Sequence, residues 1–419
     1  SGTTATGTVV SSGGYEDVYS GGASTNATVL NGGWQFVWGA GTTASGTIVS
    51  SGGYQDVYSG GAATGTIVKA GGWELAWTGG SVSGATVSSG GIEFVWSGAS
   101  AANTVVSSGG ILDDYGSTTG VTVHNGGLEY VFSGGVANGT VVNSGGNLDV
   151  FASGVASGAA INNGGWSYVW SGGLDSAGTI GSGGFQDILA GGLATGMTVS
   201  SGGLQIDYGT TSATTIVGGG LEYVYSGGVA IGTHVAGGGA LDVFAGGAAS
   251  GTVIDSGGLD FVWGGGTETG DTINAGGYEI VLSGGTLSGA TLNAGTLEIA
   301  SGGTVAGTIA FGSAGGTLKI DQAGTLGALI SGMTPTAGTL DFADIAFGAQ
   351  TTLGFTEAPD NTSGTLTVSD GTHTATVTLL GQYLAANFHK ASDGNGGTLV
   401  TDPTTVSPDL QLLVATQHV

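Results

Sequence analysis

The sequence predicts an all-β protein, a parallel β-solenoid followed by a small C-terminal β-rich module. Three observations lead to this fold. Gly-Gly pairs recur about every nineteen residues, a short strand-like segment follows each pair, and valine or isoleucine returns at one fixed position before it. The repeat is too short for helical repeat units, and it lacks the asparagine ladder of leucine-rich repeats. A coil of short strands, one turn per repeat, is therefore expected.

The Gly-Gly pairs mark the turns. They begin at Gly13, Gly32, Gly52, Gly71, Gly90, Gly109, Gly126, Gly145, Gly164, Gly183, Gly202, Gly219, Gly238, Gly257 and Gly276. The step is nineteen residues, except for one of twenty after Gly32 and two of seventeen after Gly109 and Gly202. The segments that start at Gly126 and Gly219 are nearly identical, so we infer that a five-turn block was duplicated.

Two aligned columns of residues are expected to point inward, because residues two apart on a strand share a face. One column lies three residues before each pair and holds only valine and isoleucine, from Val10 to Ile273. The other runs from Val18 to Val281 and is apolar except for Asp114 and Asp207 in the two short turns. Stacked small side chains predict a narrow, dry core with adjacent turns about 4.8 Å apart.

The opposite strand parity is expected to face outward and to form an aromatic face. Its members chosen as interaction residues are Tyr15, Tyr19, Trp34, Trp38, Tyr58, Trp73, Trp77, Trp96, Trp170 and Trp263. Soluble proteins seldom expose so continuous an apolar strip, so we expect a neighbouring molecule to cover it. The alternatives are a platform for glycans and simple ring stacking that stabilises the solenoid itself.

Past Gly295 the repeat pattern loosens. We divide the chain into solenoid repeats (1–300), irregular closing turns (301–350), and a C-terminal β-rich module with a tail (351–419). The closing turns should cover the open end of the core. In the tail, Leu410, Leu412 and Val414 share one side of an extended strand. This strand is expected to contact its own module or the first turn of a second subunit, which would give head-to-tail polymers.

Composition excludes several classes of partner. The formal net charge is -26, with 29 acidic residues against three Lys+Arg, so no nucleic acid or anionic membrane partner is expected. No apolar run approaches the roughly 20 residues that span a bilayer, so no membrane insertion is expected either. Cysteine is absent, so disulfides play no part. The first residues do not resemble a signal peptide, which suggests that any such segment is already removed.

No catalytic, cofactor-binding or metal-binding residues are predicted. β-Helix lyases use a basic residue, usually arginine, as proton acceptor, and this chain has no arginine. Asp113 and Asp114 are the best acid pair for hydrolysis, but we interpret the short-turn acids as part of a bulge or corner. The five histidines form no metal constellation. The segment Asp393-Gly-Asn-Gly-Gly resembles a fragment of a calcium loop, although a tight hairpin turn is the preferred interpretation.

One repeat carries a family resemblance. The segment beginning at Gly52 reads GGYQDVYSGGAATGTIVKAGG and matches the pattern GGxQxVxxGGxAxxTxVxxGG almost residue for residue. Residues 1–300 therefore resemble the AIDA-type repeats of bacterial autotransporter adhesins. The resemblance implies a right-handed parallel β-helix that mediates adhesion, self-association and biofilm formation, with O-glycosylation of Ser or Thr in some members. The chain departs from that family in lacking a translocator barrel, and its C-terminal module resembles those of large proteobacterial secreted proteins.

We therefore expect a secreted protein, extracellular or on the cell surface, that acts as a structural adhesin and not as an enzyme. It is expected to form homo-oligomers, as a filament or a biofilm-matrix subunit. A carbohydrate-binding adhesin that uses the same rings is the alternative. A polysaccharide-cleaving β-helix enzyme is the third hypothesis.

Overall fold

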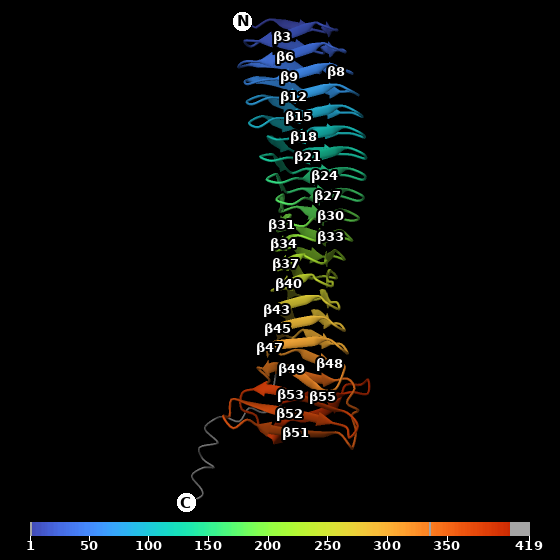
Figure 1. Ribbon diagram of the computed structural model, residues 1–419, viewed down its shortest axis with the longest axis vertical. Helices are drawn as coiled ribbons and strands as arrows, with labels where there is room; N and C mark the ends of the chain where they lie inside the picture. Colours follow the sequence, from blue (N-terminus) through green and yellow to red (C-terminus); the bar gives the residue numbers. More distant parts are fainter. Residues whose placement is uncertain (1, 335–336, 403–419) are drawn as a thin grey trace, which may run out of the picture. The chain divides into compact units, whose positions relative to one another are not determined.

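A computed structural model describes residues 2–334 and 337–402. Among these residues nearly all regular structure is β, with one short 3-10 helix, η1 (Ala385–Asn387). The described part of the chain contains no helix of the length and apolarity needed to cross a bilayer. The chain divides into two compact units, Ser1–Thr214 and Thr215–Val419. Strands in each unit are stacked turn upon turn (Figure 1).

Each turn of unit 1 contains three short strands. The first strand follows the Gly-Gly pair: β3 (Tyr15–Tyr19), β6 (Trp34–Trp38), β9 (Tyr54–Val57), β12 (Trp73–Ala76), β15 (Ile92–Val95), β18 (Ile111–Asp114), β21 (Leu128–Val131), β24 (Asn147–Val150), β27 (Trp166–Val169), β30 (Phe185–Ile188) and β33 (Leu204–Asp207). The second strands are β1 (Thr4–Thr6), β4 (Ala23–Thr25), β7 (Thr42–Ser45), β10 (Gly61–Thr64), β13 (Ser81–Ser83), β16 (Ser100–Ala102), β19 (Ser117–Thr119), β22 (Val136–Asn138), β25 (Val155–Ser157), β28 (Leu174–Ser176), β31 (Leu193–Thr195) and β34 (Thr210–Ser212). The third strands are β2 (Val9–Val10), β5 (Thr28–Val29), β8 (Ile48–Val49), β11 (Ile67–Val68), β14 (Thr86–Val87), β17 (Val105–Val106), β20 (Thr122–Val123), β23 (Val141–Val142), β26 (Ala160–Ile161), β29 (Thr179–Ile180) and β32 (Thr198–Ser200).

Strands of adjacent turns pair in parallel, and the first strands form one sheet while the second and third strands form the other. Tyr15 lies beside Trp34, and Trp34 lies beside Tyr54. The register of the sheet therefore equals the spacing of the Gly-Gly pairs. The predicted fold class, a parallel β-solenoid, is confirmed.

The Gly-Gly pair is required by the corner that it forms. Gly52 has a φ of +69°, a left-handed conformation that glycine adopts without strain. A Cβ on Gly53 would lie 2.7 Å from the carbonyl oxygen of Val29 in the preceding turn, closer than any side chain tolerates. The first glycine of the pair thus reverses the chain, and the second lets neighbouring turns approach each other.

Both predicted inward columns are buried. Val49 and Val142 from the third strands and Val37 and Val131 from the first strands each have 0% exposure. They point toward each other from the two sheets and give the solenoid an apolar interior. The alternation of side chains along short strands was sufficient to identify them.

The interior is nevertheless not wholly apolar. Two residues before each valine of the first strands, the same inward face carries a second column. In unit 1 its buried polar members are Gln35, Gln55, Glu74, Glu93, Glu129, Ser167, Gln186 and Gln205. Gln55 Nε2 donates to Gln35 Oε1 at 2.7 Å, and the Thr66 hydroxyl donates to Gln55 Oε1 at 2.8 Å. The first bond joins adjacent turns and the second lies within one turn, and both offset the cost of burying the amides.

Unit 2 continues the same architecture with longer strands. Its first strands are β36 (Leu221–Val224), β39 (Ala240–Val243), β42 (Leu259–Val262), β44 (Tyr278–Val281), β46 (Thr296–Ile299), β48 (Thr317–Ile320) and β50 (Thr339–Phe342). The facing sheet contains β35 (Thr215–Val217), β37 (Val229–Ile231), β38 (His234–Val235), β40 (Ala248–Ser250), β41 (Val253–Ile254), β43 (Thr267–Asn274), β45 (Thr286–Asn293), β47 (Thr304–Phe311) and β49 (Thr325–Ser331). From β43 onward, the second and third strands of a turn merge into one.

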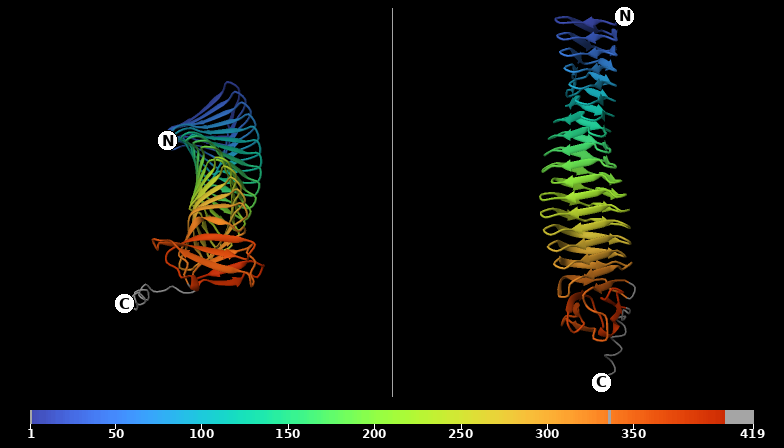
Figure 2. Two further views of the ribbon diagram at one scale, coloured as in Figure 1. Left: turned by 60° about the horizontal axis from the view of Figure 1, so that its bottom comes forward. Right: turned by 90° about the vertical axis from the view of Figure 1, so that its right-hand side faces the viewer.

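Antiparallel strands close the C-terminal end of unit 2, as Figure 2 shows in orange and red. They are β51 (Thr352–Glu357), β52 (Ser363–Ser369), β53 (Thr374–Leu380), β54 (His389–Ser392) and β55 (Thr398–Thr401). β53 pairs in parallel with β49 of the solenoid, and β52 and β51 follow it as antiparallel strands. β55 pairs antiparallel with β50, and β54 pairs antiparallel with β55. Leu366, Val377 and Val400 join the buried cluster that contains Ile330 and Phe342 of the last turns. The small C-terminal β-rich region is thus confirmed.

Candidate functional site

Aromatic side chains on the outer face of the unit 1 first strands stack into a continuous column, which we call the long ladder. Its seven rings are Tyr58, Trp77, Trp96, Tyr115, Phe132, Phe151 and Trp170. Consecutive ring centroids lie 4.6 to 5.9 Å apart, with interplanar angles of 8 to 16°. The spacing follows from parallel strands that repeat the same side chain in register. Each contact adds about 0.5–1.5 kcal/mol beyond area burial.

The strands place all ten sequence-predicted aromatic residues on the outer face. Seven are 37 to 71% exposed: Tyr15, Tyr19, Trp34, Trp38, Tyr58, Trp170 and Trp263. Trp73, Trp77 and Trp96 are half-buried between neighbouring rings.

The ten residues do not form one surface. Four of them belong to the long ladder. Trp34 and Trp73 stack on opposite sides of Tyr54, with centroids 4.2 and 6.2 Å away. Phe94, with its centroid 5.6 Å from those of both Trp73 and Trp96, links this second stack to the long ladder. Tyr19 stacks only on Trp38, at 5.4 Å, and Trp263 belongs to unit 2, where it stacks on Phe244 at 5.8 Å.

Two tryptophans of the long ladder are held by aspartates of the preceding turn, a pairing that the sequence analysis missed, whereas the buried Nε1 of Trp96 has no such partner. Trp77 Nε1 donates to Asp56 Oδ1 at 3.0 Å, and Trp170 Nε1 donates to Asp149 Oδ1 at 3.2 Å. Burial among the rings raises the pKa of both aspartates, and the indole hydrogen bond partly offsets that rise. An aspartate followed by tryptophan 21 residues later is the pattern that could have revealed these pairs.

Stacking determines what the long ladder offers to a ligand. An inner ring such as Tyr115 has parallel neighbours on both faces, so water meets mainly its edge. A sugar that packs on an aromatic side chain needs a free ring face. Free faces arise where the stacking is interrupted, as at the twenty-residue turn between Trp38 and Tyr58. There a recess of about 350 Å³ is lined by Asp17, Phe36, Trp38 and Tyr58.

Buried carboxyl groups are the second unusual feature. Glu74 and Glu93 are register neighbours inside unit 1, and neither is exposed. Burial raises the pKa of Glu74 to about 8 and, together with the neighbouring Glu74, raises the pKa of Glu93 well above its usual value. Burial also raises the pKa of Glu129 to about 8. The interior of the solenoid therefore favours protonated carboxyl groups at neutral pH.

The acids of the two short turns are arranged to stabilise a corner of the backbone, and Asp113 and Asp114 do not face each other as a catalytic pair would. Asp113 and Asp114 are adjacent on β18, so their side chains point to opposite faces of the sheet. Asp114 is buried, where its Oδ1 accepts the Gly116 N–H at 2.8 Å. Asp207 accepts the Gly209 N–H at the same distance in the second short turn. Both carboxyls thus satisfy a backbone donor at a tightened corner.

The glycine-rich segment at Asp393 forms the turn between β54 and β55, as interpreted from the sequence. Asp393 Oδ1 accepts the N–H groups of Asn395 and Gly397 at 2.7 and 2.8 Å. Its carboxyl is therefore used to shape the hairpin. The predicted contact residues Leu410, Leu412 and Val414 lie outside the described residues.

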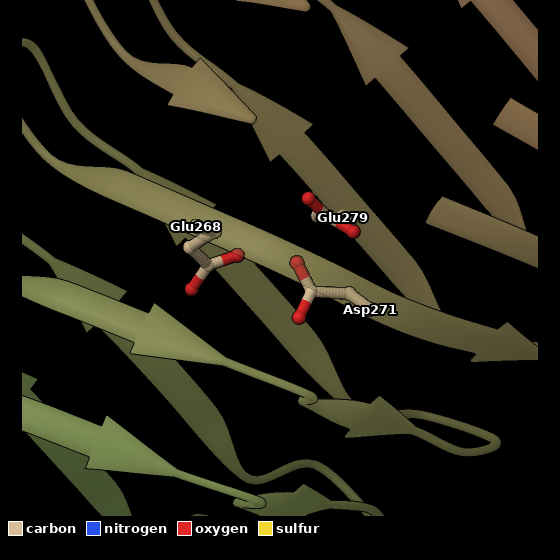
Figure 3. A group of neighbouring side chains, drawn as sticks. All are labelled: Glu268, Asp271 and Glu279. Atoms are coloured by element: carbon tan, nitrogen blue, oxygen red, sulfur yellow. The ribbon is translucent and has the colours of Figure 1, made fainter. Parts of the chain in front are cut away.

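Among residues 2–334 and 337–402, one group of acidic side chains has its carboxylate oxygens close enough together to bind a metal ion, and the sequence analysis did not identify it. Glu268, Asp271 and Glu279 lie inside unit 2 with their carboxyl groups turned toward one another (Figure 3). The sequence signal for this group was one turn with acidic residues at several inward-facing positions. That signal can be recognised only if these positions are already known to be buried.

The fold and its repeats define the class of protein. It is a parallel β-solenoid repeat protein with an outward aromatic face and a polar column inside. Residues 127–184 and 219–277 match the family model AIDA, described as an adhesin of the bacterial autotransporter system, probable stalk. These two stretches are AIDA-type repeats, of the kind described for the stalk of autotransporter adhesins.

Among solved structures, a TibC-catalysed hyper-glycosylated TibA fragment is 31% identical, with a TM-score of 0.49. The alignment covers 74% of this chain and 98% of that fragment. The search of curated proteins gave no match.

Proposed function

We propose that this protein is an extracellular structural adhesin that self-associates through its aromatic face. The observation that carries the proposal is the long ladder, in which seven rings are fixed in register along one face of unit 1. The match of its repeats to an adhesin stalk supports an adhesive role on the cell surface or after secretion.

The ladder suits contact with a second copy of the chain. Its exposed ring edges recur at the spacing of the strands, about 4.8 Å, so two ladders have matching periods. Burying exposed aromatic surface stabilises association by about 25 cal/mol per Å² before the entropy cost of association. The formal net charge of -26 opposes this contact. Salt screens that repulsion within about 8 Å at physiological ionic strength, so association should strengthen as salt is added.

The test is a triple substitution of Trp38→Ser, Trp77→Ser and Trp96→Ser, followed by light scattering and sedimentation at increasing salt. We expect at least a tenfold loss of association with the β signal of circular dichroism intact. Ile67→Ser with Leu193→Ser is the matched control, because both side chains are exposed on the facing sheet. Equal association of the triple variant and the parent protein would refute the proposal.

Carbohydrate binding is the second candidate, and the recess between Trp38 and Tyr58 favours it. Three rings with free faces and the exposed Asp17 carboxyl combine stacking surface with a hydrogen-bond acceptor. Binding to a glycan array should be lost in Trp38→Ala and retained in Trp170→Ala. A protein that binds no glycan, or one whose binding survives Trp38→Ala, would exclude this recess as a sugar site.

A further inference from the structure

One turn of unit 2 breaks the usual interior pattern. In the turn that starts at Gly238, three neighbouring inward positions, one on the first strand and two on the facing sheet, hold Leu241, Ala249 and Thr252. In the turn that starts at Gly257 the equivalent positions all hold acids. These are Asp260 on β42 and Glu268 and Asp271 on β43.

The next turn adds a fourth acid. Glu279 on β44 is the register neighbour of Asp260, so it lies directly above it in the same column. All four side chains have no more than 1% exposure. We call these residues, Asp260, Glu268, Asp271 and Glu279, the acid cluster.

The carboxyl groups of the acid cluster converge. One oxygen each from Glu268, Asp271 and Glu279 lies within 4.8 Å of the others, and the three groups face a common point in Figure 3. The Thr252 N–H donates to Asp271 Oδ1 at 2.9 Å. This bond fixes the Asp271 side chain and leaves its Oδ2 for the cluster.

Apart from the Thr252 N–H, no hydrogen-bond donor or positive charge among the described residues compensates the cluster. Both oxygens of Asp260, Glu268 and Glu279, and Oδ2 of Asp271, receive no hydrogen bond. The chain has no arginine, and Lys319, the lysine of unit 2 that forms ion pairs among the described residues, contacts Glu298 and Asp321. Burial and mutual repulsion raise the pKa of Asp260, Glu268 and Glu279 well above their usual values. Four such groups in one interior are costly unless a ligand neutralises them.

We propose that the acid cluster binds a calcium ion inside the solenoid, with Glu268, Asp271 and Glu279 as ligands and Asp260 beside them. Carboxylate oxygens are the ligands of hard cations, and Ca²⁺ holds them at about 2.3–2.6 Å. Oxygens on opposite sides of such an ion are about 5 Å apart at most, which accommodates the observed spread. Mg²⁺ binds oxygens at about 2.0–2.1 Å in a stricter octahedral geometry and keeps several waters, which suits a closed interior less well.

A competing account is that Asp260 and Glu268 share a proton and bind no metal. The two accounts differ in their response to pH. Calcium binding requires ionised carboxyl groups, so it releases protons and strengthens as pH rises. A shared proton stabilises the fold at low pH and gives no response to calcium. The readouts are therefore bound calcium and the calcium dependence of unfolding.

Because the cluster is buried, the full-length protein should be unfolded with EDTA and refolded with or without millimolar CaCl₂. After dialysis we expect one tightly bound calcium ion per chain by elemental analysis. We also expect calcium to raise the Tm by several degrees at neutral pH. Glu268→Gln combined with Asp271→Asn should abolish both effects.

Two control variants locate the ion. Glu129→Gln removes a buried acid of unit 1, and Asp393→Asn removes the acid of the C-terminal hairpin. Both should retain the calcium ion and the rise in Tm. Absence of bound calcium in the parent protein, or an unchanged calcium response in the Glu268→Gln, Asp271→Asn variant, would overturn the proposal.

Discussion

Replacing Glu129 with glutamine should make the protein more stable in alkaline solution. Glu129 lies on β21 with 0% exposure, and its Oε1 accepts the Thr118 hydroxyl at 3.1 Å. Burial, followed by the nearby Asp114, raises its pKa from 4.5 to about 8. Glutamine has the same size and already occupies this column at Gln35 and Gln186.

The sign of the effect follows from the raised pKa. A carboxyl that holds its proton more tightly in the folded state stabilises the fold fully below about pH 4.5. That stability is lost as pH rises through about 8, at about 1.4 kcal/mol per pH unit. Between these limits the loss from Glu129 amounts to about 4–5 kcal/mol. Glutamine does not ionise, so the variant should escape this loss.

The assay is urea unfolding of the parent and Glu129→Gln proteins across this pH range. Near about pH 5 the two should differ by less than about 1 kcal/mol, and near about pH 9 the variant should be more stable by several. Asp17→Asn is the control, because it removes a carboxyl from the equivalent type of strand at an exposed position and leaves the interior of the solenoid untouched. An identical pH dependence in Glu129→Gln and the parent would refute the reasoning.

Three further predictions concern the core, the corners and the tail. Val142→Asp, which puts a carboxylate at a position with 0% exposure, should lower the free energy of unfolding by about 3 kcal/mol or more, and an unchanged urea midpoint would contradict this. Gly53→Ala should cost about 1–3 kcal/mol because its Cβ meets the Val29 carbonyl at 2.7 Å. Gly65→Ala is the control, because Gly65 has a φ of +64° but open space around it, and this variant should lose less stability. Equal losses of the two variants in thermal unfolding would contradict a cost from the Val29 contact. If the tail joins subunits head to tail, deletion of residues 409–419 should abolish these assemblies in electron micrographs while the solenoid stays folded. Undiminished assemblies would exclude a role for Leu410, Leu412 and Val414.

The repeat made much of the fold predictable. A column that never departs from valine or isoleucine, such as Val49 and Val142, can only be buried, and alternation then places Trp77 outside. Register followed from the Gly-Gly spacing because parallel turns must repeat the same corner. These are local rules, and a repeat applies each of them many times.

The polar column was missed although the same rule predicts it. Gln35 has the parity of Val37, so alternation puts both inside, but a polar residue suggests exposure when it is considered alone. Burial is possible because Gln35 meets Gln55 and Thr47 from other strands. Those partners are found only once the turns are aligned. The acid cluster was missed for the same reason, since Asp260 and Glu279 become neighbours only through the register.

The hydrogen bonds between glutamines of successive turns bear on how such a chain changes length during evolution. Turns share one backbone geometry, so any single repeat could be copied or lost without disturbing the strands. Gln35, however, donates to Glu16 of the preceding turn and accepts from Gln55 of the following turn, so its side chain is matched to the turns on both sides. Copying one turn in tandem would place that turn against its own copy and leave polar groups unmatched there, whereas copying several turns together keeps the contacts inside the block. The near-identical segments that start at Gly126 and Gly219, which repeat Glu129 and Leu148 as Glu222 and Leu241, fit a history of recombination by blocks of turns.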